Sequence, residues 1–238
     1  MTAVLSLDLA TRRYRDNGIA VVTWTQGRLS VELLDPSSIG LVGEPTVRAL
    51  GEALLDTADR LAIRWILIDG PQGWKSSHSS LVHQRQCERE THTPGKTGLP
   101  GVVKPRPWTR MAEFSIGLFD FLDGHGWPRY GDDRRSHVAV ETFPTQAWRS
   151  LGHDPLPGKH NRGMQVSCWA SWLSDRLRLT WPRMPSHDEL QATVAGLAGP
   201  GLAGIAGWNI ASFGQAPTFE GGCWREGLIV GPGSGRPG

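Results

Sequence analysis

The first third of the chain alternates apolar and polar positions in a way that predicts three short strands. Residues 3–9 carry leucines on one face, residues 19–24 are β-branched and aromatic, and residues 29–34 follow a Gln-Gly turn. Because the connections are short enough for hairpins, we expect an antiparallel meander at the start of the chain.

A different pattern follows the meander. Residues 44–61 carry apolar side chains at helical spacing, and the next apolar run, residues 65–68, is continuous and suits a strand buried on both faces. Residues 137–140 predict another buried strand, and further helices are expected over 112–122, 161–177 and 186–197. A meander followed by strands that alternate with helices is typical of an α/β fold with a mixed, five-stranded sheet flanked by helices.

The 238 residues suit one domain, which we assign to residues 1–230. Residues 70–108 are rich in Gly, Pro, His, Lys and Arg and have weak periodicity, which predicts an irregular insertion with one or two helical turns. The Gly- and Pro-rich end, residues 231–238, is typical of a disordered tail.

The net charge of +2 indicates no strong field around the whole molecule, but the insertion is basic. Residues 70–111 hold seven Lys or Arg against two Asp or Glu, and Trp74 and Trp108 lie among them. Cationic side chains neutralise phosphates and tryptophan stacks on unpaired bases, so we expect nucleic acid to bind here; a solvated loop is the alternative. The side chains expected to contact the substrate are Arg85, Arg89, Lys75 and Lys104.

The remaining signals narrow the class of protein. The three cysteines form no CxxC pair, the N-terminus has no basic region before an apolar stretch, and the uncharged run over 191–219 is broken by Pro200. We therefore expect a cytoplasmic protein without a membrane partner. His78, His83, Cys87 and His92 match no zinc spacing, and no phosphate-binding glycine motif is present.

Acidic residues lie at the ends of three predicted strands. Asp8 ends the first, Asp69 follows the 65–68 run and Glu141 follows the 137–140 run. Each could be a simple turn former. However, ligands of open α/β sheets bind at the carboxyl ends of strands, so neighbouring strands would bring these acids together. Converging carboxylates need a cation, and hard oxygen ligands favour Mg²⁺ or Mn²⁺.

A fourth acid comes from the helix that begins after Ser186. Ser186 and Glu189 have the spacing of a capping box, which would occupy Glu189. Asp188 is therefore the better candidate for the site, although a favourable charge at the helix N-terminus would also explain it. We expect Asp8, Asp69 and Asp188 to be the metal ligands.

Several short motifs, taken in order, resemble domain-of-unknown-function family 429, whose members are predicted RNase H-like nucleases. They are Ser6-Leu-Asp8-Leu-Ala10, Asp69-Gly70-Pro71, Arg85-Gln-Cys87-Glu-Arg89, Glu141-Thr-Phe-Pro144, His187-Asp-Glu-Leu-Gln-Ala192 and Glu226-Gly-Leu-Ile-Val-Gly-Pro232. The resemblance implies an RNase H-like fold and a catalytic set of Asp8, Asp69, Glu141 and Asp188. It departs at Gln191, where the family often has a second helix aspartate.

Two functions follow as hypotheses. The preferred one is a hydrolase, a nuclease that uses carboxylate-bound Mg²⁺ or Mn²⁺ to cleave phosphodiester bonds in RNA or DNA. The alternative is a non-catalytic RNase H-like module that binds nucleic acid or protein, with an acid site weakened by Gln191. A phosphotransferase of the actin and sugar-kinase type is a weaker third, since the chain is short for a duplicated core.

Overall fold

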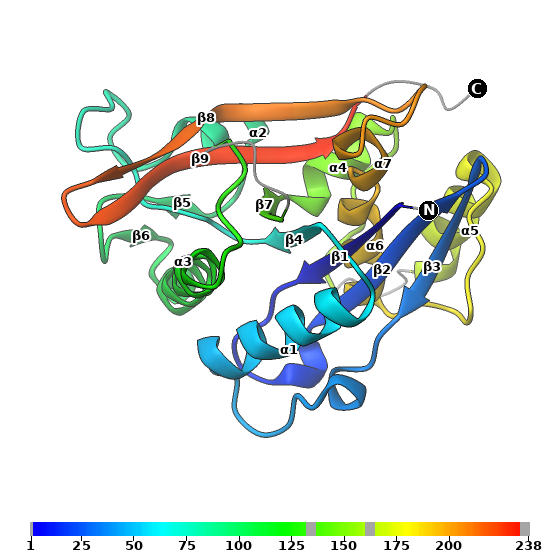
Figure 1. Ribbon diagram of the computed structural model, residues 1–238. Helices are drawn as coiled ribbons and strands as arrows, with labels where there is room; N and C mark the ends of the chain where they lie inside the picture. Colours follow the sequence, from blue (N-terminus) through cyan, green and yellow to red (C-terminus); the bar gives the residue numbers. More distant parts are fainter. Residues whose placement is uncertain (1, 132–136, 160–164, 234–238) are drawn as a thin grey trace.

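The computed structural model describes residues 2–131, 137–159 and 165–233. In these ranges a seven-stranded sheet runs in the order β3-β2-β1-β4-β7-β9-β8, and a separate two-stranded sheet is formed by β5 and β6 (Figure 1). Most of the predicted tail, residues 234–238, lies outside the described residues.

The predicted meander and the parallel strands beside it are confirmed. β1 (Thr2–Asp8) pairs antiparallel with β2 (Gly18–Thr25), which pairs antiparallel with β3 (Arg28–Leu33). On its other side β1 pairs parallel with β4 (Trp65–Asp69), and β4 pairs parallel with β7 (Val138–Thr142). The fold is the expected mixed α/β sheet, with the carboxyl ends of β1, β4 and β7 at one edge.

The sheet has two more strands than the five predicted. β8 (Ile210–Glu220) and β9 (Cys223–Pro232) form a long hairpin, and β9 continues the sheet in parallel with β7. The hairpin was missed because β8 is largely exposed and contains a glycine and a proline, which hide the period-two pattern. β9 also includes the first two residues of the predicted tail.

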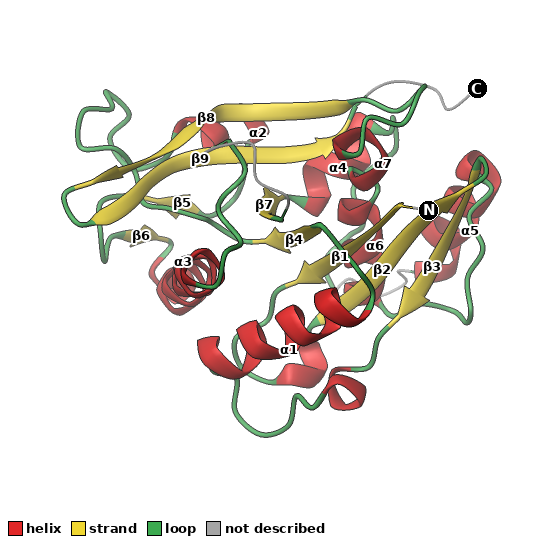
Figure 2. Ribbon diagram, viewed as in Figure 1, coloured by secondary structure: helices red, strands yellow, loops and turns green. Residues whose placement is uncertain are grey.

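Helices cover both faces of the sheet (Figure 2). One apolar cluster joins inward residues of α1 (Val47–Arg60) and α3 (Thr109–Gly124) to the sheet. The other joins α4 (Pro144–Ser150), α5 (Val166–Leu177) and α6 (His187–Gly196) to the opposite face. α7 (Gly199–Leu202) and the 3₁₀ turns η1 (Tyr14–Asp16) and η2 (Pro36–Ile39) complete these layers.

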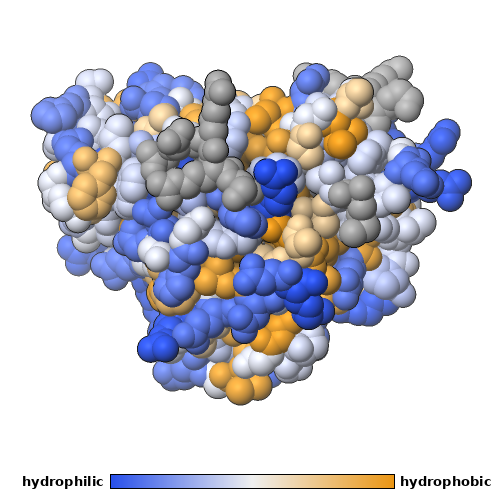
Figure 3. All heavy atoms as spheres, viewed as in Figure 1, coloured by the Kyte–Doolittle hydropathy of each residue, from blue (hydrophilic) through white to orange (hydrophobic). Residues whose placement is uncertain are grey.

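Several tryptophans contribute to the core cluster beneath α4, α5 and α6. Trp148 is fully buried, and Trp65, Trp169 and Trp172 pack partly buried against the same cluster. On the face drawn in Figure 3, hydrophilic and hydrophobic residues are interspersed rather than segregated. No helix among the described residues is long and apolar enough to cross a membrane.

The insertion is more ordered than its sequence suggests. It contains α2 (Gln86–Thr91), β5 (Lys96–Thr97), β6 (Val103–Lys104) and the 3₁₀ turn η3 (Arg106–Trp108). Trp74, expected to stack on a base, is instead buried in a small cluster with Val103 and α3. α2 also protects the outer edge of the sheet, because Glu90 accepts a hydrogen bond from the Gly214 backbone of β8.

Candidate metal centre

Two of the predicted acids meet because their strands are neighbours in register. Asp8 ends β1, Asp69 ends β4, and the two residues are directly paired across the parallel ladder. Both keep a partly exposed face. The carboxyl groups are therefore close together and reachable from solvent at the carboxyl edge of the sheet.

A close approach of two backbones brings Asp188 to the same place. Gly18, the β2 partner of Asp8, lies so near the start of α6 that a Cβ added to it would be 2.0 Å from the Asp188 carbonyl oxygen. A side chain at this position would push α6 away from the sheet. The predicted capping box fixes the helix start, since Ser186 accepts from the Glu189 backbone and Glu189 accepts from the Ser186 backbone.

Electrostatics show that the three carboxyl groups interact. Burial, followed by the charges of Asp69 and Asp188, raises the pKa of Asp8 well above its usual range. Burial also raises the pKa of Asp69 to about 7, with a contribution from the charge of Glu141. Both shifts favour the protonated forms, because desolvated carboxylates repel each other when no cation lies between them.

Asp188 differs because it already has cationic partners. Partial burial acts to raise its pKa, but hydrogen bonds from His187 and Lys159 outweigh burial and lower it. Lys159 forms an ion pair with one carboxylate oxygen of Asp188, and the His187 ring lies 3.0 Å from the other. This side of the cluster is therefore ionised and partly neutralised by the protein.

His187 is a possible ligand that sequence reasoning missed. A ring nitrogen of His187 and carboxylate oxygens of Asp8 and Asp188 all lie within 4.8 Å of one another, a spacing that a metal ion could bridge. Nδ1 is 3.0 Å from Asp188 and Nε2 is 3.0 Å from the Pro157 carbonyl. In the tautomer that donates from Nε2 to Pro157, Nδ1 carries a lone pair that could bind a metal. The signal was the position of His187 directly before Asp188 in the first turn of the helix.

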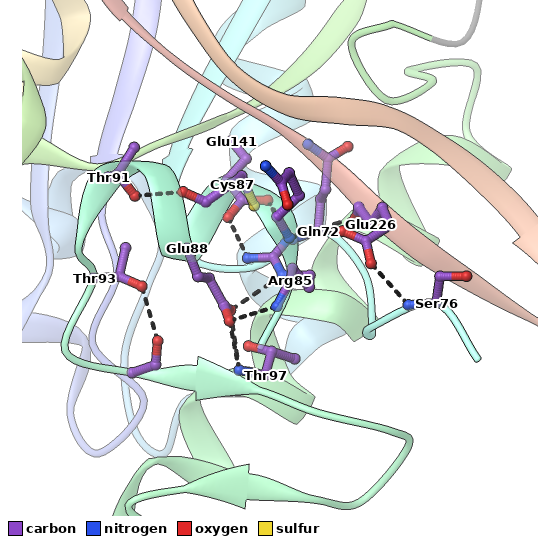
Figure 4. Close-up of polar contacts among 12 residues, drawn as sticks. Gln72, Ser76, Arg85, Cys87, Glu88, Thr91, Thr93, Thr97, Glu141 and Glu226 are labelled. Atoms are coloured by element: carbon purple, nitrogen blue, oxygen red, sulfur yellow. Dashed lines mark hydrogen bonds and ion pairs between the residues drawn. The ribbon is translucent and has the colours of Figure 1, made fainter. Parts of the chain in front are cut away.

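Glu141 and Arg85, expected in the catalytic and the substrate-binding sets, bind each other. Arg85 Nη1 and Nη2 donate to the two carboxylate oxygens of Glu141 over 2.8 and 2.6 Å, and Arg85 Nε donates to Glu88 over 3.1 Å (Figure 4). The Gln72 backbone donates to Glu141 over 3.0 Å. Arg85 is 1% exposed, so it cannot reach a substrate in this arrangement.

The other predicted contact residues divide by exposure. Lys75 is buried, and its ammonium group donates to the backbone carbonyls of Ser76 and Ser79 over 2.9 and 3.1 Å. That interaction stabilises the start of the insertion and leaves the charge unavailable to a phosphate. Arg89 and Lys104 are exposed and remain candidates for substrate binding.

Gln191 serves the core. Its side-chain oxygen accepts a hydrogen bond of 2.9 Å from the indole nitrogen of the fully buried Trp148. A buried indole N–H without an acceptor would be costly. The difference from the resembled family at this position therefore has a packing reason. His187 instead supplies a further potential metal ligand beside Asp8 and Asp188.

Comparison with known proteins gives a distant likeness. No family model and no curated protein matches the chain, so the resemblance to family 429 stays a prediction. Among solved structures, the chain is similar to Thermus thermophilus RuvC, at 13% identity and a TM-score of 0.42 over 85% of this chain and 97% of that one. It is also similar to T. thermophilus RuvC in complex with Holliday junction substrate, at 11% identity and a TM-score of 0.42 over 86% and 97%. Because both likenesses are distant, the function of this chain is inferred from its own residues.

Proposed function

We propose that this protein is a metal-dependent nuclease that hydrolyses phosphodiester bonds in RNA or DNA. The observation that carries the proposal is the position of Asp8, which is paired with Asp69 across the parallel ladder and lies within reach of Asp188 and His187, with the pKa of Asp8 and Asp69 raised. Carboxylates that retain protons for lack of a counter-charge are suited to binding a divalent cation, which would replace those protons.

The side chains that could bind a metal suit Mn²⁺ better than Mg²⁺ if His187 takes part. Oxygen ligands alone would suit either ion, whereas the ring nitrogen of His187 makes Mn²⁺ the better match. When bound, such an ion would activate water and stabilise the charge that develops on the phosphate. Asp8, Asp69 and Asp188 would hold it, and Asp8 and Asp69 would lose their shared proton to do so.

Exposed cations of the insertion would bind the substrate backbone. Arg89 and Lys104 are exposed, as are Arg106 and Arg110 beside them in η3 and at the start of α3. Each contact with a phosphate releases counterions, so binding should weaken as salt concentration rises. The small net charge of the whole protein makes this a local effect of one surface.

Glu141 would act as a positioning residue rather than as a ligand. It anchors Arg85, and through Arg85 it fixes α2 and the insertion to the end of β7, one residue from the partner of Asp69. The cationic surface is thereby held at a fixed place relative to the acid cluster.

The direct test is metal-dependent cleavage. Full-length protein with Mg²⁺ or Mn²⁺ should cleave labelled single-stranded or duplex oligonucleotides, and Asp8→Asn and Asp69→Asn should each reduce the rate by roughly a hundredfold or more. Asp56→Asn, on the exposed side of α1, is the matched control and should cleave normally. Cleavage that neither site variant changes would contradict the proposal.

The ion pair between Lys159 and Asp188 favours a second candidate, a non-catalytic nucleic-acid-binding module. There the lysine would be a permanent substitute for a metal ion. This candidate predicts salt-sensitive oligonucleotide binding with no turnover in either metal.

A further inference from the structure

A pocket lies next to the acid cluster, between the insertion and the sheet. Asp69 and the Arg85–Glu141 pair border it on the sheet side. Its other walls are mainly apolar and come from the insertion, α3 and the end of β7; they include Pro94, Gly95, Val103, Trp108, Met111 and Phe143. An apolar pocket that opens beside candidate catalytic carboxylates is placed to hold a part of the substrate adjacent to the reacting group.

Trp108 gives this pocket an aromatic wall that solvent can reach. The residue lines the pocket and is 38% exposed. The backbone of Gly95 lies against the indole, because a Cβ added there would be 2.4 Å from Trp108 Cε3. Any larger residue at 95 would move the ring, so the glycine keeps the indole in a defined orientation.

Cationic residues lie near Trp108 in the sequence and in the pocket lining. Lys104, Arg106 and Arg110 are close to Trp108 in sequence and are all exposed, and Lys96 lines the pocket itself. A ligand with a planar apolar ring and a nearby anionic group would complement both features. A nucleotide has both, whereas an apolar peptide side chain would leave the cations without partners.

The size of the pocket limits the ligand further. Its volume of about 60 Å³ is less than half of the roughly 150 Å³ of a cavity that encloses benzene, so a ring stacked on Trp108 would lie partly outside the pocket. A base within a duplex is stacked on both sides and paired, so it cannot enter unless it is unpaired or turned out of the helix.

We propose that this pocket receives one unpaired base of the substrate, stacked against Trp108, while the adjacent phosphate lies at Asp69. This inference rests on the proposed nuclease function and narrows its substrate class to single-stranded nucleic acid or to strands with unpaired bases. The pocket, rather than the cations alone, then selects the substrate.

The test measures binding without cleavage. Full-length protein in EDTA is titrated into a fluorescently labelled oligothymidylate and into a labelled duplex of mixed sequence, with anisotropy as the readout. Trp108→Ala should weaken binding of the single strand by about tenfold and change duplex binding less than twofold, and Trp108→Phe should restore most of the loss. Phe219→Ala, an exposed aromatic residue outside the pocket, should change neither.

The outcomes separate the two proposals. Equal losses on single strand and duplex, or no loss with Trp108→Ala, would overturn the pocket assignment and leave the nuclease proposal standing. If no oligonucleotide binds at low salt, both are overturned. If Trp108→Ala binds oligonucleotides normally and still cleaves them with a metal ion, only the pocket assignment is overturned, and the nuclease proposal stands.

Discussion

Two groups of acidic side chains lie near the same edge of the sheet, and they differ in burial and in counter-charge. Glu141 and Glu88 share the guanidinium group of Arg85, which is itself buried and fully engaged. Asp8 and Asp69 have no ion pair with any residue that the structure describes, and the pKa of both is raised. The first group therefore has a cationic partner within the protein, whereas the second would need a proton or an added cation.

This difference separates a structural acid from a candidate ligand better than burial or position in the sequence does. All three strand-end acids looked alike in the sequence. In the sheet Glu141 pairs with Ile68 whereas Asp69 pairs with Thr142, so the alternation of side chains along a strand places Glu141 toward the opposite face, and Glu141 has a counter-charge that Asp69 lacks. Asp188 is intermediate, because it forms an ion pair with Lys159 and a hydrogen bond with His187.

The largest expected effect comes from breaking the complete group. Arg85→Met should lower the free energy of unfolding by about 3–5 kcal/mol, because it leaves two buried carboxylates without a partner. Urea denaturation of the metal-free protein measures this. Arg89→Met, four residues further on and exposed, is the control and should cost less than about 0.5 kcal/mol. Similar small effects in both variants would show that the pair does not hold the insertion in place.

Removing a charge from the Asp8–Asp69 pair should stabilise the metal-free protein rather than destabilise it. The raised pKa of Asp69 means that the folded protein binds this proton more tightly than the unfolded chain does, so the contribution is present at low pH and is lost as pH rises through about 7. Asp69→Asn should therefore stabilise the metal-free protein at pH 8 by about 1–3 kcal/mol and have little effect at pH 4.

Urea denaturation in EDTA at several pH values between 4 and 8 checks this, with Asp56→Asn as the surface control. The stability difference between Asp69→Asn and the unchanged protein should grow as the pH rises. A destabilising Asp69→Asn at pH 8 would mean that the carboxylate has a counter-charge within the protein.

A smaller effect is expected at Gln191. Gln191→Asp introduces an acid next to the candidate site, but its shorter side chain would no longer reach the indole of Trp148. We expect a loss of about 1 kcal/mol in stability and no gain in Mn²⁺ affinity. Thermal unfolding and a metal titration of the variant give both values, and a tighter metal site would show that residue 191 faces the acids after all.

The sequence predicted the meander and the parallel strands from local patterns, and the register places Asp8 beside Asp69. It could not predict what neutralises each acid. The partner of Glu141 lies 56 residues away in an insertion without periodicity, and the partner of Gln191 lies on another helix. Lys75 and Trp74 looked like surface residues because their burial depends on how the insertion folds over α3.

The most direct measurement is a calorimetric titration of Mn²⁺ into metal-free protein at pH 8. We predict saturable binding. Asp8→Asn and Asp69→Asn should each weaken the Mn²⁺ affinity by at least about tenfold, whereas Glu141→Gln should change it by less than about threefold. Retained affinity in both aspartate variants, or its loss in Glu141→Gln alone, would contradict the assignment of the metal centre to the acids that lack a counter-charge.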